Sequence, residues 1–191
     1  MKKFVAAIAS ILLVSAMLTG AMAAVPSVTV PSVSVSTTTV QGTDGKGVNV
    51  KIVDAETELV DNDELTVRVT TLEEAVESDK FVADVYAAAS EAESIDAYVK
   101  SLGLEDVDLT GYVLSTMVKL EPNAALAAAA QESGVTMTLV VPGVTAEMEV
   151  SAVVLEQVDG QTVAHAVEAE NTADGVVVTT NVFGLMLIAV K

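Results

Sequence analysis

The one histidine, His165, is the first candidate for acid–base chemistry, because imidazole titrates near neutral pH. Three serines could supply a nucleophile beside it: Ser115, Ser133 and Ser151. However, the sequence contains no Gly-x-Ser-x-Gly turn of the kind that exposes a nucleophilic serine. His165 alternates with Val163 and Val167, and this spacing puts the three residues on one face of a strand. The pattern predicts a packed or surface histidine, and we assign no catalytic residue.

Acidic residues are the most abundant groups that could bind a ligand. Asp61, Asp63 and Glu64 lie in one polar turn and are the candidates for binding Ca²⁺, which takes several oxygen ligands. An EF-hand loop also needs a glycine and a distant glutamate at fixed spacing, and these are missing. A solvated acidic turn is therefore the alternative. Zinc sites use Cys and His ligands, and with no cysteine and one histidine we expect no cofactor beyond this Ca²⁺ candidate.

Carboxylate pairs also hydrolyse glycosidic bonds, so a hydrolase that uses acidic residues stays open as an alternative. Sugar-binding clefts rely on aromatic platforms, whereas the sequence has no tryptophan. After residue 23 the aromatic residues are few: Phe81, Tyr86, Tyr98, Tyr112 and Phe183. A pocket lined by the three tyrosines would favour an extracellular ligand- or glycan-binding module. Arg68, the sole arginine, is expected to pair with an acid on a neighbouring strand.

The elements that position these residues follow an export signal. Lys2 and Lys3 precede an apolar run over residues 4–18, and a small-x-small sequence ends at Ala23. This order predicts a secretory signal peptide over residues 1–23, cleaved after Ala23. The apolar run of about 15 residues is shorter than the roughly 20 that a membrane-spanning helix needs. We therefore expect a secreted, extracellular protein with no membrane span after processing, either released or retained at the cell surface.

Charge limits the partners of the processed chain. Loss of the two lysines of the signal peptide takes the formal net charge from −18 to −20. Such a charge repels nucleic acid and anionic membrane surfaces, so we expect a protein or cell-wall partner. Because there is no cysteine, no disulfide stabilises the exported domain. Its stability must come from a core of Val, Ala, Leu, Ile and Met side chains.

Residues 24–47 form a leader in which valine alternates with serine and threonine. This alternation is typical of an extended chain with one apolar face. Pro26 and Pro31 disfavour a central strand, so the pattern predicts a flexible or edge-strand leader. An exposed strand edge would also allow self-association.

The remaining residues, 48–191, are predicted to form one α+β domain. Alternating apolar residues over 48–53 and 65–69 predict two strands that could pair as a hairpin. Thr71 and Glu74 then fit a capping box, which opens an insert of two or three helices over about residues 72–102. Ser78 or Asp79 is expected to cap a second helix of this insert, Ser94 a third, and Gly103 to follow the last.

Strand periodicity returns after Gly111 and continues to the C-terminus. An alanine-rich stretch over 124–131 interrupts it and predicts a short surface helix. Asp-Gly turns at 159–160 and 174–175 separate further strands at intervals of 8–12 residues. The domain is therefore predicted to be an antiparallel β-sandwich, immunoglobulin-like or related, with a helical insert.

The C-terminal strands also carry a resemblance to a known group of modules. In segments 154–160 and 174–180 a strand meets an Asp-Gly turn, and the last apolar strand, 183–190, begins with Phe183 and Gly184. Over about residues 112–191 the chain resembles the terminal β-sandwich modules of secreted and cell-surface proteins of Gram-positive bacteria, in which serine is common at the position of Gly184. The resemblance implies an extracellular structural or adhesive module. We therefore expect a noncatalytic interaction domain, with the binding module and the hydrolase as alternatives.

Overall fold

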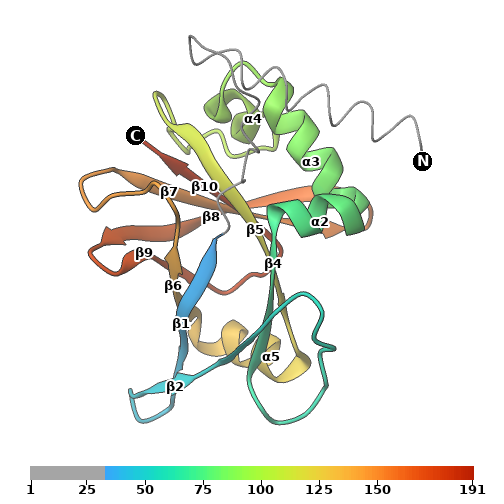
Figure 1. The fold of residues 1–191 in the computed structure, drawn as a ribbon, viewed down its shortest axis with the longest axis vertical. Coiled ribbons are helices and arrows are strands. Elements are labelled where there is room, and N and C mark those ends of the chain that lie inside the picture. The colour runs from blue at the N-terminus through green and yellow to red at the C-terminus, as the bar shows by residue number, and fades with distance from the viewer. Residues whose placement is uncertain (1–32) are drawn as a thin grey trace, which may run out of the picture.

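A computed structural model of the chain describes residues 33–191 (Figure 1). The predicted signal peptide and its cleavage site at Ala23 lie outside this range. The strands are β1 Ser34–Gln41, β2 Gly47–Asn49, β3 Lys51–Val53, β4 Thr66–Thr71, β5 Val113–Pro122, β6 Val135–Val140, β7 Val150–Val158, β8 Gln161–Thr172, β9 Gly175–Thr180 and β10 Leu185–Val190. The helices are α2 Leu72–Ser78, α3 Lys80–Glu91, α4 Ile95–Ser101 and α5 Ala124–Ser133. This β-rich mixture of strands and helices confirms the predicted α+β class.

The ten strands join one mixed sheet in the order β2-β1-β6-β9-β8-β7-β10-β5-β4-β3. The long strand β8 pairs with β7 through its first half and with β9 through its second half. This strand therefore connects the two parts of the sheet. The two ends of the order, β2 and β3, are consecutive in the chain. Between them the Val50 N–H donates to Thr38 of β1, and the Lys51 N–H donates to Leu65 next to β4. Residues 47–53 therefore close the sheet on itself.

This closure changes two predictions. The expected single strand over 48–53 is divided into β2 and β3, which pair with different partners. The expected hairpin between it and the next strand is wrong, because β3 and β4 pair in parallel. Parallel strands start at the same end of a sheet, so a long connection must return the chain from the end of β3 to the start of β4. Residues 54–65 are long enough to do this. The immunoglobulin-like sandwich stays a prediction.

The inner face of the sheet encloses the main apolar core. Met137 of β6, Val154 of β7 and Ile188 of β10 are fully buried in it. Helix α5 packs against the same core through Leu126 and Ala130, which have no exposed surface. The predicted surface helix is therefore present: one side packs on the core, and residues 124, 128 and 131–133 are exposed. Ten residues of high helix propensity need such tertiary contacts to remain folded.

A second apolar core lies on the outer face, under the helical insert. Helices α2, α3 and α4 lie together at the opposite end of the molecule from α5 (Figure 1). Their side chains, including Val82 and Val99, pack against Met117 of β5 and Leu187 of β10. Strand β10 thus has a core on each face, which explains why its sequence is apolar without alternation. Within residues 33–191, no helix is long and apolar enough to cross a membrane.

The caps of the insert are those that the sequence predicts. The Thr71 hydroxyl accepts from the Glu74 N–H, and the Glu74 carboxylate accepts from the Thr71 N–H, which forms the capping box of α2. Asp79 caps α3 and Ser94 caps α4. Gly103 follows α4 with a φ of 92°. These polar side chains satisfy helix N–H groups that would otherwise lack partners.

The described part of the leader belongs to the sheet. Residues 34–41 form β1, which pairs with β6 along its length and with β2 at residues 39–41. Val40 is buried in the inner core. The first residues of β1, 34–37, are paired with β6 alone, as in an edge strand, whereas residues 39–41 lie between β6 and β2. The prolines that disfavour a central strand precede this strand.

Candidate functional site

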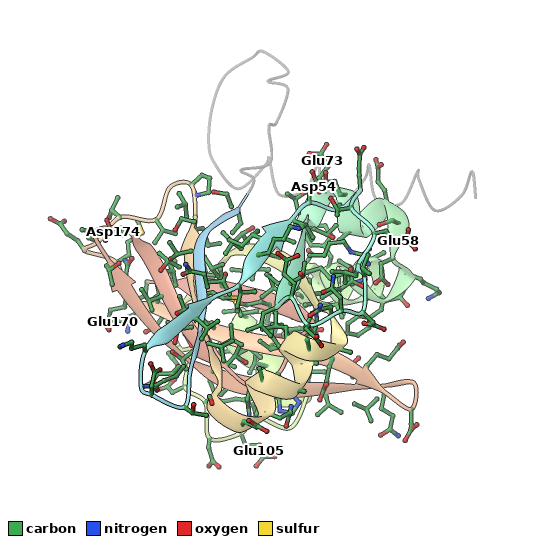
Figure 2. All side chains as sticks on the ribbon, turned by 90° about the horizontal axis from the view of Figure 1, so that it is seen from below. Asp54, Glu58, Glu73, Glu105, Glu170 and Asp174 are labelled. Carbon is green, nitrogen blue, oxygen red and sulfur yellow. The ribbon has the colours of Figure 1, made fainter. Side chains whose placement is uncertain are left out.

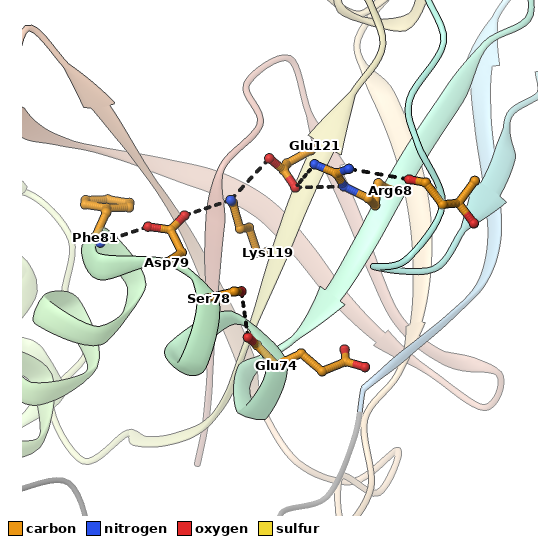
Figure 3. A network of polar contacts seen from close by, with 8 residues as sticks. Arg68, Glu74, Ser78, Asp79, Phe81, Lys119 and Glu121 are labelled. Atoms are coloured by element: carbon orange, nitrogen blue, oxygen red, sulfur yellow. Dashed lines mark hydrogen bonds and ion pairs between the residues drawn. The ribbon is translucent and has the colours of Figure 1, made fainter. Parts of the chain in front are cut away.

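Four charged residues form a continuous chain of contacts between the helices and the sheet. We call them the ion-pair cluster: Arg68, Asp79, Lys119 and Glu121 (Figure 3). Lys119 Nζ lies 2.7 Å from Asp79 Oδ2 and 3.2 Å from Glu121 Oε1. Arg68 donates from Nη2 and Nε to Glu121 Oε2, at 2.8 Å and 3.0 Å. Arg68 thus pairs with an acid on the neighbouring strand, as the sequence predicts.

Local sequence places each member of the cluster. Lys119 and Glu121 alternate with the buried Val118 and Leu120 of β5, so both point to the outer face, toward the helices. Asp79 is the N-cap of α3, and its Oδ1 accepts from the second backbone N–H of that helix at 2.8 Å. Its other oxygen, Oδ2, contacts Lys119. The cluster therefore attaches the start of α3 to strand β5.

The members of the cluster hold one another in the charged state. Burial opposes ionisation of Asp79, but hydrogen bonds from Lys119 and from backbone N–H groups of α3 outweigh it and lower the pKa of this carboxyl. Burial likewise opposes ionisation of Glu121, and Arg68 and Lys119 reverse the effect, so its pKa is lowered. For Lys119, burial acts to lower the pKa, but the two carboxylates raise it above its ordinary value. These charges therefore neutralise one another at neutral pH.

A groove of about 360 Å³ opens beside the cluster. We call it the phenylalanine groove, because it is lined by Phe81 and Phe183, the two phenylalanines of residues 24–191. Four charged residues also line it: Asp79, Lys119, Glu121 and Glu156. Three carboxylates thus accompany one ammonium group. Because Lys119 and Arg68 neutralise Asp79 and Glu121, the groove combines half-buried aromatic rings with the carboxylate of Glu156.

The groove lies where strand β10 begins. The ladder between β10 and β7 ends at Leu155, and that between β10 and β5 ends at Lys119. However, β7 continues to Val158 and β5 continues to Pro122. Both neighbours thus run three residues beyond the start of β10, and residues of both extensions line the groove.

Gly184 turns the chain into β10 at this point. Its φ is +153°, and an added Cβ would lie 2.3 Å from the carbonyl oxygen of Leu155 on β7. Its own carbonyl accepts from the Leu120 N–H at 2.8 Å. This close approach of three strands requires a residue without a side chain. The serine that is common at this position in the Gram-positive modules would not fit here.

A second depression, of about 690 Å³, lies on the other side of the cluster. Its lining is mostly charged and includes Glu56, Arg68, Glu74, Glu77 and Lys80. Glu74 is already used in the capping box of α2. This depression therefore has the character of a solvated polar surface, in contrast to the aromatic walls of the phenylalanine groove.

The histidine lies on the strand next to β7. His165 is half-buried on β8, opposite Val154, and its Nε2 lies 2.8 Å from Glu156 Oε1. Within residues 33–191 the side-chain partner of His165 is this glutamate and not one of the three serines. The assignment of a packed or surface histidine stays a prediction. The contact also orients a carboxylate that lies next to the phenylalanine groove.

The three Ca²⁺ candidates are not assembled into a site. Asp61 Oδ1 accepts from the Ala124 N–H at 3.2 Å, and Glu64 Oε2 pairs with Lys51 Nζ at 3.1 Å. Asp63 is exposed. In the part of the chain that the structure describes, no three His, Asp or Glu side chains are grouped so that they could hold a metal ion. The three side chains thus have different surroundings, and the choice between a Ca²⁺ site and a solvated acidic turn stays a prediction.

A buried asparagine organises this acidic turn. Asn123 Oδ1 accepts from the N–H groups of Thr66 and Leu126, at 3.2 Å and 3.0 Å. Its Nδ2 donates to the carbonyls of Val60 and Glu64, at 3.2 Å and 2.7 Å. One side chain thus caps α5 and fixes the connection that leads into β4.

The three tyrosines pack in or against the outer core. Tyr98 is buried in the outer core, and Tyr86 and Tyr112 pack against the same core. None of them lines either of the two depressions. Their rings therefore contribute to the packing of the helical insert.

Acidic side chains are spread over the surface. The carboxylates labelled in Figure 2 project from several sides of the molecule and from elements at both ends of the chain. All six are exposed: Asp54, Glu58, Glu73, Glu105, Glu170 and Asp174. The large negative charge is therefore a property of the whole surface, which keeps like molecules apart in solution.

Sequence reasoning missed two features of the site. The cluster joins Asp79 to Lys119, and abundant acids gave no means of choosing this partner. The groove joins Phe81 to Phe183, and the only available signal was that phenylalanine is rare in this chain. No family model, no curated protein and no solved structure matches the chain.

Proposed function

We propose that this chain is a noncatalytic, exported interaction domain that acts outside the cytoplasm or at a cell surface. The supporting observation is that the charged groups of the ion-pair cluster are paired with one another. Lys119 contacts Asp79 and Glu121, and Arg68 contacts Glu121, so these groups satisfy one another. An active site instead keeps an acid, base or nucleophile available to a substrate. Here the charges hold α3 against β5, which is a structural role.

Further support comes from the stability that such a domain needs outside the cell. The chain has no cysteine, and a closed sheet with one apolar core inside and another beneath the helices takes the place of disulfides. An immunoglobulin-like sandwich and a relationship to the Gram-positive terminal modules are part of this proposal.

The test has two parts. Export is checked by expressing the full chain in its producing cells and measuring the N-terminus of the protein in the medium, where we expect Ala24. Interaction is checked by incubating labelled protein 24–191 with isolated cell envelopes. We expect saturable binding that unlabelled protein displaces. Retention of residues 1–23 on protein inside the cell, or binding that does not saturate, would contradict the proposal.

An extracellular ligand-binding module is the second candidate, because the phenylalanine groove offers aromatic walls and polar groups together. The hydrolase alternative is tested on the same protein with a panel of glycoside and ester substrates. Turnover that is lost on Glu156→Gln substitution and kept on Glu170→Gln substitution would replace the interaction function by a catalytic one.

A further inference from the structure

We propose that the phenylalanine groove binds an extended segment of a partner polypeptide that carries a basic side chain. This inference rests on the proposed interaction function and specifies its partner. The first argument is the shape of the sheet. Strands β7 and β5 both continue past the start of β10, and residues 156–158 and 120–122 flank the place where β10 would extend.

Backbone groups that face this gap are available to a short extended segment. The ladders of β10 end at Leu155 and Lys119, and beyond them only the contact between Leu120 and Gly184 bridges to the turn before β10. A peptide that enters such a gap adds main-chain hydrogen bonds, as strand addition does at other sheet edges. The volume of about 360 Å³ admits only a short stretch of chain, so we expect weak binding.

The second argument is charge complementarity. Lys119 and Arg68 neutralise Asp79 and Glu121, so Glu156 is the carboxylate of the groove that has no lysine or arginine partner among the described residues. The hydrogen-bond partner of Glu156 is the half-buried His165, at 2.8 Å. An incoming ammonium or guanidinium group is therefore attracted, and a carboxylate is repelled. The net charge of −20 after processing strengthens this preference at long range.

The third argument is the pair of aromatic rings. Phe81 and Phe183 both line the groove and are each half-buried. The methylene groups of a lysine or arginine side chain can pack on such rings while the charged end reaches the carboxylates. An aromatic face also attracts the cation itself. Together the rings and the acids select an apolar stem that ends in a positive charge.

The experiment uses folded protein 24–191 and three blocked pentapeptides, acetyl-Ala-Val-X-Val-Ala-amide, in which X is lysine, norleucine or glutamate. Binding is followed by amide shifts in ¹⁵N-labelled protein. We expect the lysine peptide to bind with a Kd of about 1 mM and to shift the amides of Glu121, Glu156 and Gln157. The norleucine peptide should bind about fivefold more weakly, which is the size of one partly exposed ionic contact. The glutamate peptide should not bind measurably.

Two variants control the result. Glu156→Gln should weaken the lysine peptide about threefold to fivefold and leave the norleucine peptide unchanged. Glu170→Gln removes the same charge from an exposed site outside the groove and should leave both peptides unchanged. Equal affinity for all three peptides, or shifts that map elsewhere, would overturn the inference. Saturable binding to cell envelopes would then still support the proposed function, because that test uses the whole surface of the domain.

Discussion

Replacement of Gly184 by alanine tests whether β10 meets β7 as closely as the structure indicates. The new Cβ would lie 2.3 Å from the Leu155 carbonyl oxygen, whereas Cβ contacts under 3.0 Å are essentially never found. The nearest atoms belong to the backbone of a central strand, so they cannot move aside as a flexible side chain would. Strand β10 must therefore shift, although both of its faces are buried in apolar cores.

The expected loss of stability combines two effects. A left-handed backbone conformation costs an alanine about 1–3 kcal/mol. Displacement of β10 weakens hydrogen bonds that contribute about 1 kcal/mol each, including the one between Leu120 and Gly184. We therefore expect Gly184→Ala to lower the free energy of unfolding by about 3–5 kcal/mol. For a domain of this size that corresponds to a fall in the melting temperature of at least about 6 °C.

Gly160→Ala is the matched control. Gly160 lies in the turn between β7 and β8 with a φ of +78°, but nothing lies within 4 Å of an added Cβ. This variant therefore has the backbone strain without the steric overlap, and we expect a loss of about 1 kcal/mol. Urea denaturation followed by far-ultraviolet circular dichroism measures both variants. The reasoning is refuted if Gly184→Ala is no less stable than Gly160→Ala.

Four further predictions concern the polar groups. Lys119→Met should lower the free energy of unfolding, measured by urea denaturation, by about 1–3 kcal/mol. A double-mutant cycle with Asp79→Asn should give a coupling free energy of about 1 kcal/mol. If the losses of the two single variants add up in the double variant, the pairing is contradicted. Because the pKa values of Asp79 and Glu121 lie below their ordinary 3.8 and 4.5, their stabilisation is complete above those values and is lost as the pH falls through the lower folded-state values. Melting temperatures should therefore fall steeply below about pH 4, and less steeply in Asp79→Asn. Asn123→Ala removes one hydrogen bond from each of four backbone groups and should lower the free energy of unfolding by about 2–4 kcal/mol. About 5 mM Ca²⁺ should leave the wild-type melting temperature unchanged.

Local features of the fold could be predicted because their signals are local. The capping box of Thr71 and Glu74 and the cap at Asp79 depend on residues within one helical turn. The Asp159-Gly160 turn has φ values of 50° and 78°, which is the two-residue hairpin turn that this dipeptide favours. Strands β7, β8 and β9 follow for the same reason, since consecutive antiparallel strands need only such turns.

Long-range features could not be predicted in the same way. The segment around Val50 reads as one strand, and nothing in its alternation indicates that its two halves pair with opposite ends of the sheet. The apolar sequence of β10 does not by itself indicate whether β10 is an edge strand or a central strand of the sheet. The helices that cover its outer face explain why both faces are apolar. Pairing of Asp79 with Lys119 is a similar case, because the sequence offers many acids for each cation. These contacts are selected by topology, which single-sequence patterns do not carry.

Closure of the sheet also explains why a binding site is expected at one particular place. Backbone N–H and carbonyl groups of a strand need partners, and in a closed sheet neighbouring strands supply most of them. Strands β5 and β7 run three residues past the start of β10, because Gly184 and Phe183 turn the chain away from the gap. The backbone left there by β5 and β7 can be satisfied by water or by another chain. The surrounding carboxylates then favour a positively charged chain over a negatively charged one.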